Sequence, residues 1–304
     1  MIDVKQLEAL LAVVEHTGFV PAAKALGISV AAVSQRVKAL ETDMGQRLIT
    51  RGKHQRLTGA GQALLAHARQ VRWMEADLLA QLKGDGQRSK RQWQTLSVAV
   101  NADSLASWFL PGVAETVRSH RLLLDILIDD QDHTHAALEH GDVVACVSTL
   151  EAPMRGCRAD PLGVMRYVAV ASEAVAARCQ AGSDAERLHL LLREPAVIFN
   201  RKDGLQDVFL YQRFGVSQAS YPRHFAPAVD AFEAALVHGM GWGMVPEVHL
   251  AQCPGLQPVY EGAGVDVALY WHHWAQEPLA ARHLTDAVMV AARSSLRPLR
   301  ASGD

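Results

Sequence analysis

The apolar residues of the first 58 positions predict three short helices followed by a hairpin. The first helix is marked by apolar side chains at helical spacing, namely Val4, Leu7, Leu10, Leu11 and Val14, with Gly18 as its stop. A second helix opens around Pro21, which suits a helix start, and ends at Gly27. Ser29 then serves as the N-cap of a third helix, whose inner face carries Val33, Val37 and Leu40. So tight a turn between two helices indicates a helix-turn-helix.

Two short strands, 48–51 and 55–58, flank a basic turn and predict a wing. Thr58 caps a long helix over about residues 59–82, which spans about 35 Å at 1.5 Å per residue. Its apolar stripe has heptad-like spacing and consists of Leu64, Ala68, Val71, Leu78 and Leu82, interrupted by Glu75. Such a helix either packs on its own domain or stands free as a dimer helix. We favour the dimer helix, because no neighbouring segment of the sequence offers a matching surface.

Beyond the polar linker 84–94 (GDGQRSKRQWQ), predicted strands alternate with predicted helices. The strands are 96–100, 124–128, 143–147, 164–170, 196–199, 243–246 and 267–271. The helices lie at about 105–118, 133–140, 185–193, 205–213, 230–239 and 278–297. This alternation indicates α/β architecture with a mostly parallel sheet. A stretch of this length suits two small lobes, with a ligand cleft beyond the carboxyl ends of the strands.

The overall composition is ordinary, and the distribution of charge is the informative part. The 304 residues are 49% hydrophobic and 20% charged, with a formal net charge of -2. Residues 1–91 hold 14 Lys and Arg against 8 Asp and Glu, whereas residues 92–304 hold 16 against 24. A positive charge on residues 1–91 and a negative charge on residues 92–304 indicate that the first segment contacts nucleic acid.

Several other classes of protein find little support in the sequence. No stretch approaches the ~20 apolar residues of a membrane span, and the N-terminus lacks the layout of a secretory signal. The cysteines are scattered and fit reduced thiols in a cytoplasmic protein: Cys146, Cys157, Cys179 and Cys253. The histidines at 133, 135 and 140 lack partners at metal-ligand spacing. Gly239, Gly241 and Gly243 precede a strand, which favours tight packing over a dinucleotide site. No catalytic constellation suggests an enzyme.

The outward face of the third helix is the candidate DNA-reading surface. Its alanines are small enough to let the helix approach the floor of a groove, and Ser34 and Gln35 can hydrogen-bond to base edges. The basic residues beside them and on the wing suit phosphates. Isolated charges are usually a solvated face, but here the helix-turn-helix spacing favours DNA contact. The predicted DNA-binding residues are Ser29, Val30, Ala31, Ala32, Ser34, Gln35, Arg36, Lys38, Arg51, Lys53 and Arg56.

In these residues the chain resembles LysR-type transcriptional regulators. The matching runs of the head are 22–29 (AAKALGIS), 32–41 (AVSQRVKALE) and 57–61 (LTGAG). The rest is similar to the branch that regulates basic amino-acid export in response to lysine and arginine, also described as a chromosome-initiation inhibitor. The similar runs are 97–106 (SVAVNADSLA), 269–272 (LYWH), 284–287 (LTDA) and, more weakly, 200–203 (NRKD) and 243–246 (GMVP). Two runs depart from the branch: Val30 and Ala31 replace a common Gln-Ser, and 227–230 (PAVD) is less polar.

The resemblance implies a cytoplasmic, non-enzymatic regulator of α/β fold class. It implies a winged helix-turn-helix over 1–58, a linker helix and hinge over 59–90, and a two-lobed effector domain over 91–304 like type 2 periplasmic binding proteins. The first lobe would hold 91–163 and 267–304, and the second 164–266. The implied partners are double-stranded promoter DNA, a small-molecule effector and a second copy of the chain in a homodimer or homotetramer. RNA polymerase is a further candidate partner. No cofactor and no membrane are implied, and the effector would be lysine or arginine.

The residues expected in the cleft suit a cationic amino acid. Ser104, at the start of a helix after the first strand, places a hydroxyl and backbone N–H groups where a carboxylate is favoured. Aspartates beside strand ends can pair with an ammonium or guanidinium group, although each could equally be a helix cap or a surface carboxylate. The predicted effector-binding residues are Asn101, Asp103, Ser104, Asp129, Asp130, Ser148, Asn200 and Asp230.

Two other functions fit the same residues in part. A LysR-type regulator with a different small-molecule effector would explain the less polar run at 227–230. A cytoplasmic amino-acid-binding protein without promoter control would explain the effector region, but it leaves residues 1–58 without a use.

Overall fold

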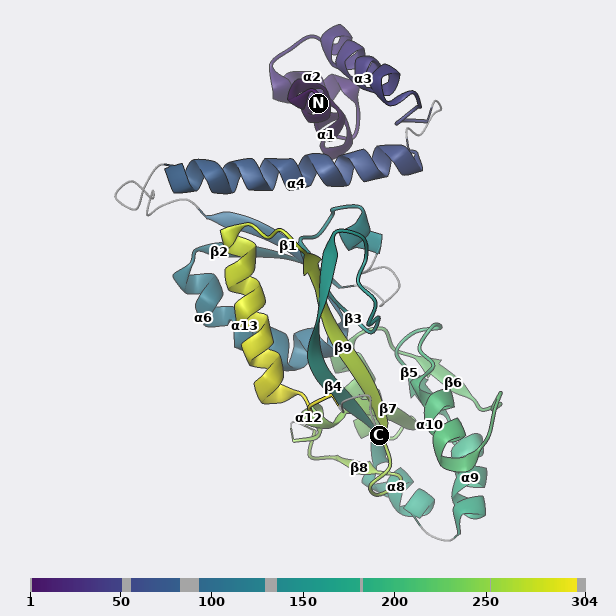
Figure 1. Ribbon diagram of the computed structural model, residues 1–304. Helices are drawn as coiled ribbons and strands as arrows, with labels where there is room; N and C mark the ends of the chain where they lie inside the picture. The colour runs from purple at the N-terminus through teal and green to yellow at the C-terminus, as the bar shows by residue number, and fades with distance from the viewer. Residues whose placement is uncertain are drawn as a thin grey trace.

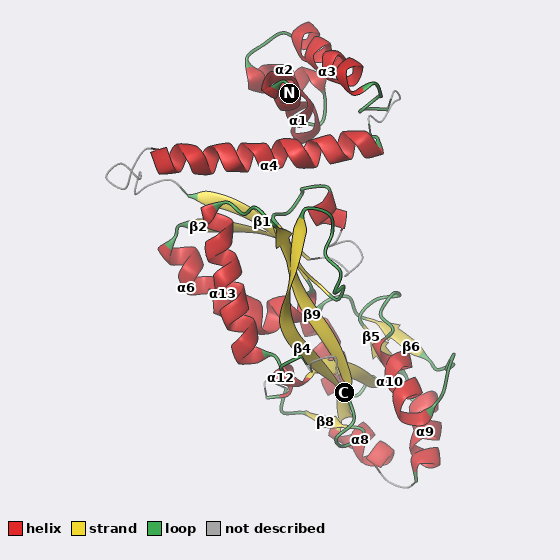
Figure 2. Ribbon diagram, viewed as in Figure 1, coloured by secondary structure: helices red, strands yellow, loops and turns green. Residues whose placement is uncertain are grey.

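A computed structural model describes residues 2–50, 56–82, 93–128, 136–180, 183–251 and 253–299. A helical head stands on one side of a long helix, and an α/β body hangs on the other side (Figures 1 and 2). The predicted combination of a winged helix-turn-helix, a linker helix and a two-lobed α/β body is therefore confirmed. None of the helices in these residues is long and apolar enough to cross a membrane.

The head is the predicted helix-turn-helix, and local signals set its boundaries. It consists of α1 (Val4–Glu15), α2 (Phe19–Leu26) and α3 (Val30–Met44). Gly27 ends α2 in the left-handed conformation with φ 65°, which costs glycine little. The Ser29 hydroxyl oxygen accepts a hydrogen bond from the Ala32 N–H at 3.2 Å and so caps α3. Gly18 does not end α1, which stops at Glu15; it stands instead at the N-cap of α2.

The two arms of the wing pair as a short hairpin. Ile49 and Leu57 form an antiparallel bridge, and the Thr50 N–H donates to the Arg56 carbonyl at 2.7 Å. The tip of the wing, including Arg51 and Lys53, lies outside the described residues. At the far end of the hairpin, the Thr58 hydroxyl accepts from the Gly61 N–H at 3.1 Å and caps the long helix as predicted.

The long helix α4 (Gly59–Leu82) packs on the head through its first half. Ala68 is buried against Leu7 and Leu10, and Arg72 makes a bidentate ion pair with Glu15 at 2.8 and 3.1 Å. A free-standing helix is therefore wrong for this half, because α1 supplies the apolar surface that the neighbouring sequence lacks. The second half exposes its apolar side chains Met74, Leu78, Leu79 and Leu82.

The same helix also contacts the body. The Arg69 guanidinium donates to the His140 carbonyl at 3.0 Å and pairs with Asp142 at 2.5 Å. Between them, Gly141 has φ 67° and lies so close to α4 that a Cβ there would stand 2.8 Å from the Ala66 Cα. The head and the body are thus held by different faces of one helix.

Gly141→Ala tests this close approach, with Gly215→Ala as its matched control. Gly215 has φ 70° but open space around the added carbon. Its variant should therefore lose only the unfolding free energy that left-handed strain costs, about 1–2 kcal/mol. Gly141→Ala should lose about 1–3 kcal/mol more unfolding free energy than this control, which is the usual cost of overpacking. Urea denaturation measures both losses of unfolding free energy, and equal losses would show that Ala66 does not restrict residue 141.

The body is one mixed sheet with helices on its faces. Its strands, in spatial order, are β2 (Leu122–Ile128), β1 (Gln94–Val100), β3 (Ala145–Ser148), β9 (Val265–Trp274), β4 (Cys157–Ser172), β7 (Trp242–Pro246), β5 (Ala196–Ile198) and β6 (Arg223–Phe225), with β8 (Leu256–Pro258) beside β4. We call β1–β3 and their helices the first lobe, β5–β7 and their helices the second lobe, and β4 and β9 the crossover strands. The two lobes lie at opposite ends of the crossover strands (Figure 2).

The prediction of a mostly parallel sheet is wrong at these crossover strands. The pairs β1–β2, β1–β3, β5–β6 and β5–β7 are parallel, but β4 and β9 run antiparallel to each other and to their neighbours. β4 is also much longer than the predicted strand 164–170. Its first half is polar, half-exposed and broken by a bulge between Pro161 and Gly163, so the sequence there lacks the alternation of a strand.

The helices of the body surround the sheet and bury its core. They include α5 (Ala102–Ser104), the π-helical η1 (Leu105–Phe109), α6 (Leu110–Ser119), α8 (Glu173–Gln180), α9 (Asp184–Arg193), α10 (Leu205–Phe214), α11 (Val229–Val237), α12 (Glu247–Leu250) and α13 (Leu279–Ser295). The largest fully buried side chains include Phe109 and Trp271 toward the first lobe and Phe209 and Trp242 in the second. Gly241 and Gly243 do serve tight packing: a Cβ at Gly241 would stand 1.9 Å from the Pro195 carbonyl oxygen.

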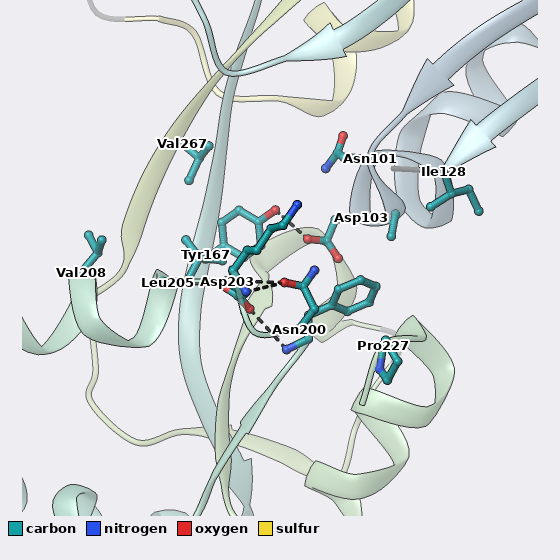
Figure 3. Close-up of a pocket in the computed structure, with 14 residues that line it drawn as sticks. Asn101, Asp103, Ile128, Tyr167, Asn200, Asp203, Leu205, Val208, Pro227 and Val267 are labelled. Atoms are coloured by element: carbon teal, nitrogen blue, oxygen red, sulfur yellow. Dashed lines mark hydrogen bonds between the residues drawn. The ribbon is translucent and has the colours of Figure 1, made fainter. Parts of the chain in front are cut away.

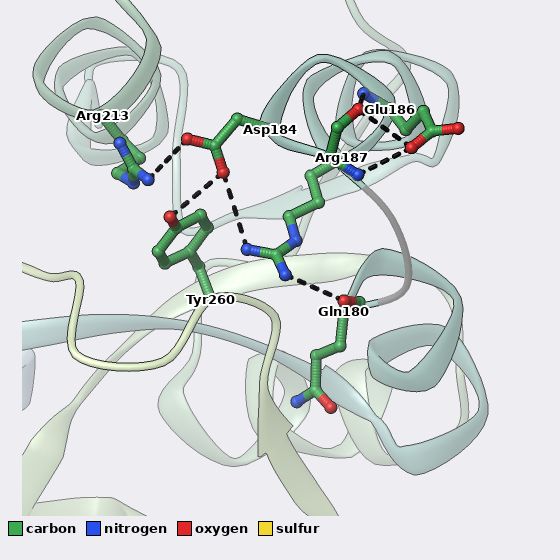
Figure 4. Close-up of polar contacts among 7 residues, drawn as sticks. Gln180, Asp184, Glu186, Arg187, Arg213 and Tyr260 are labelled. Carbon is green, nitrogen blue, oxygen red and sulfur yellow. Dashed lines mark hydrogen bonds and ion pairs between the residues drawn. The ribbon is translucent and has the colours of Figure 1, made fainter.

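A polar cluster around Asp184 joins the outer helices of the second lobe (Figure 4). The Asp184 carboxylate pairs with Arg213 at 2.7 Å and accepts a hydrogen bond from the Tyr260 hydroxyl at 3.1 Å. The guanidinium groups of Arg187 and Arg213 lie 5.0 and 4.1 Å from the centre of the Tyr260 ring. These contacts tie the segment before β9 to α9 and α10.

Candidate functional site

A cavity of about 590 Å³ opens between the two lobes, a size that suits a small-molecule ligand (Figure 3). Its walls come from the start of α5, the crossover strands and the loop between β5 and α10. The lining residues are Asn101, Ala102, Asp103, Ile128, Tyr167, Phe199, Asn200, Lys202, Asp203, Gly204, Leu205, Val208, Pro227 and Val267. The cavity therefore lies beyond the carboxyl ends of β1 and β5, where a ligand site is expected in α/β sheets.

The second-lobe wall is a loop fixed by its own side chains. The Asn200 side-chain oxygen accepts from the backbone N–H groups of Lys202 and Asp203 at 2.8 and 3.2 Å. The Asp203 carboxylate in turn accepts from the N–H groups of Phe199 and of Leu205, the first residue of α10, at 3.3 and 3.0 Å. These Asx-type contacts hold the loop against the cavity without a regular element (Figure 3).

The first-lobe wall presents a half-buried carboxylate. Asp103 lies in the first turn of α5, and its carboxylate accepts a hydrogen bond from the Tyr167 hydroxyl at 2.7 Å. Burial raises the pKa of Asp103 above its usual range, while the hydrogen bond from Tyr167 opposes that rise. A cationic group that entered the cavity would pair with a carboxylate that is already partly desolvated.

The structure brings three of the predicted effector residues to the cavity: Asn101, Asp103 and Asn200. Ser104 is fully buried and stands outside the lining. Ser148 ends β3, where its hydroxyl accepts from the Leu150 N–H at 3.1 Å, and Asp230 is exposed in the first turn of α11. Asp129 and Asp130 lie outside the described residues.

Sequence reasoning missed several residues of the cavity, above all Tyr167 and Asp203. Tyr167 begins the apolar run 167–171 of β4, so its hydroxyl was the only signal that something polar faces it. Asp203 lies three residues after the predicted Asn200 in a polar loop and two residues before the first residue of α10, so its sequence position gave no specific signal. The apolar lining residues, such as Ile128 at the end of β2 and Val267 within β9, carry no chemical signature.

The candidate DNA surface is formed by the outward side of α3. Val30, Ala31, Ser34, Gln35 and Lys38 are exposed, and Ser29 and Arg56 flank them in the capping turn and on the wing. Ala32 and Arg36 are half-buried at the edge of this face, while Val33 and Val37 fill the core of the head. The face thus combines a small, polar centre with basic edges, as a helix that enters a DNA groove requires.

Other candidate chemistry does not assemble in the described residues. No group of three or more His, Cys, Asp or Glu side chains could hold a metal ion there. His272 faces the Leu150 carbonyl, whereas His273 lies between Asp160 and Glu277, so the adjacent histidines serve different contacts. The four cysteines, all within the described ranges, are free thiols.

Comparison with known proteins agrees with this architecture. Residues 4–62 match the bacterial regulatory helix-turn-helix proteins of the lysR family, and residues 91–292 match the LysR substrate binding domain. The chain is 38% identical to the HTH-type transcriptional regulator LysG of Mycobacterium tuberculosis, over 97% of this chain and 95% of that protein. The crystal structure of ArgP from Mycobacterium tuberculosis superimposes with a TM-score of 0.86 at 37% identity, covering 98% and 100% of the two chains.

A second solved structure carries a ligand. Full-length LysG from Corynebacterium glutamicum with bound effector arginine superimposes with a TM-score of 0.81 at 32% identity, over 97% of this chain and all of that one. The two family matches cover the head and the body, and the full-length similarities also span the long helix between them. The chain therefore belongs to the LysR family of bacterial transcriptional regulators.

Proposed function

We propose that this regulator binds promoter DNA through α3 and the wing and responds to a basic amino acid, lysine or arginine, bound between its lobes. The observation that carries the effector assignment is the half-buried Asp103 carboxylate at the cavity wall. Asp203 adds a second carboxylate, and the negative charge of residues 92–304 favours a cation over an anion. The arginine in the related LysG structure supports the same ligand class.

The assembly and setting of the protein follow from this proposal. The proposal includes a location in the cytoplasm, no enzymatic activity and no cofactor. The exposed apolar side chains of the second half of α4 suit a homodimer or homotetramer. The proposed domains are 1–58, 59–90 and 91–304, and RNA polymerase is a proposed partner at the promoter.

A thermal-shift panel tests the effector. Arginine and lysine should stabilise the full-length protein by about 2.7 kcal/mol at a ligand concentration of about 100 Kd. Citrulline, which has the shape of arginine without its charge, should produce little shift. Indifference to both basic amino acids would refute the effector assignment, and promoter binding measured alongside would then indicate a regulator with a different effector. A protein that is stabilised by arginine or lysine but does not bind promoter DNA would be an amino-acid-binding protein without promoter control.

A further inference from the structure

Tyr167 contributes a polar group from the crossover strand β4 to the wall of the cavity. The residue is 4% exposed, and its hydroxyl donates to Asp103 in the first lobe at 2.7 Å. Figure 3 shows the phenol reaching along the wall to the carboxylate. A phenylalanine would fill nearly the same volume, so the distinguishing feature of a tyrosine here is the hydrogen bond that it gives to Asp103.

The groups around Asp103 pull its ionisation in opposite directions. Burial favours the neutral acid, as do the carboxylates of Asp203 in the cavity loop and Glu233 on α11. The Tyr167 hydroxyl on β4 and His249 on α12 favour the carboxylate. The His249 ring is itself held by Glu233, with Nδ1 and Oε1 2.7 Å apart. Lys202 is the cation of the cavity lining, on the opposite lobe. Tyr167 is in direct hydrogen-bond contact with this carboxylate.

We propose that Tyr167 is a positioning residue for the effector: its hydroxyl holds the Asp103 carboxylate as the acceptor for the cationic group of a basic amino acid, and thereby makes the response sensitive to pH. The inference rests on the proposed function. A neutral Asp103 could not pair with the cation, so affinity should fall as the pH falls. Removal of the phenol hydroxyl should move that fall to higher pH, since the carboxylate loses the donor that opposes burial.

The first test needs no effector. Selective ¹³C labelling of aspartate carboxyl groups gives the titration of Asp103 in the full-length protein, and Asp103→Asn identifies its signal. In Tyr167→Phe the pKa of Asp103 should be higher than in the wild type. Tyr221→Phe is the matched control, because it removes a similar 2.7 Å hydrogen bond to Asp207 away from the cavity lining. A pKa of Asp103 that is unchanged or lower in Tyr167→Phe would overturn the proposal.

The second test uses arginine as the probe. Calorimetric titrations between about pH 5 and about pH 8 span the range above the ordinary aspartate pKa. Tyr167→Phe should bind arginine about tenfold more weakly at the acidic end, the usual size of a lost hydrogen bond to a charged group, and should approach wild type at the alkaline end. An equal loss at every pH would indicate a merely structural role and overturn the proposal.

The remaining outcomes are also decisive. If Tyr167→Phe does not fold, the wild-type profile decides, because affinity for arginine that is the same across this pH range contradicts the proposal. If the folded wild type binds neither arginine nor lysine, the proposed function fails, while the titration of Asp103 still shows whether Tyr167 controls its ionisation.

Discussion

Asp103→Asn is expected to weaken arginine binding by about 100-fold at neutral pH and to remove the preference for arginine over citrulline. The substitution keeps the shape of the side chain and an oxygen that can accept from Tyr167, but it removes the negative charge. Loss of one partner from a desolvated charge pair costs about 2–5 kcal/mol, and each 1.4 kcal/mol is a factor of ten in affinity. Isothermal titration calorimetry with both ligands measures the two effects together.

A loss of fold can be separated from a loss of charge. The pKa of Asp103 is raised in the folded protein by burial, so its ionised form makes the fold less stable at neutral pH. The neutral variant should therefore melt no lower than the wild type without ligand. Asp286→Asn removes an exposed carboxylate on α13 and should leave arginine binding unchanged. Near wild-type affinity in Asp103→Asn would place the cationic group of the effector elsewhere.

The head was predictable from sequence because its signals are local. Gly27 and Ser29 end one helix and begin the next within three residues, and both act through contacts with their own neighbours. The inner face of α3 follows from helical spacing alone, because Val33, Val37 and Leu40 need no distant partner to define it.

The long helix and the crossover strands were less predictable because their partners are distant in sequence. Arg72 of α4 forms an ion pair with Glu15 in the head, 57 residues away, and Arg69 forms one with Asp142 in the body, 73 residues away. Arg166 of β4 pairs with Asp266 of β9, 100 residues away. The polar first half of β4 also lacks the alternation that would predict a strand. Periodicity reports which face of an element is buried, but it does not identify the element that covers it.

The candidate cleft shows the same limit at single residues. Asn101, Asp103 and Asn200 were predictable because each follows a strand, and carboxyl ends of strands meet at a cleft. Tyr167 reaches Asp103 from 64 residues away and begins the fully buried run 167–172 of β4. No local pattern separates such a tyrosine from an ordinary core residue.

Gln35→Ala is expected to reduce the discrimination between a promoter site and unrelated DNA by about tenfold or more, with little change in affinity for unrelated DNA. Gln35 is exposed at the centre of the outward face of α3, where its amide can form two hydrogen bonds to one base edge. Such a pair contributes about 1–3 kcal/mol of discrimination against the wrong base. Fluorescence anisotropy with a footprinted promoter fragment and a scrambled duplex gives the ratio directly.

Arg56→Ala provides the contrast, because the exposed guanidinium on the wing suits a phosphate and no particular base. This variant should weaken both duplexes alike and reduce the salt slope of binding by about one. The two variants therefore separate base reading from charge attraction within one small head. If Gln35→Ala leaves the ratio of affinities for promoter and scrambled duplex unchanged, Gln35 does not read a base. If binding by the wild type does not depend on salt, the basic edges do not contact phosphates.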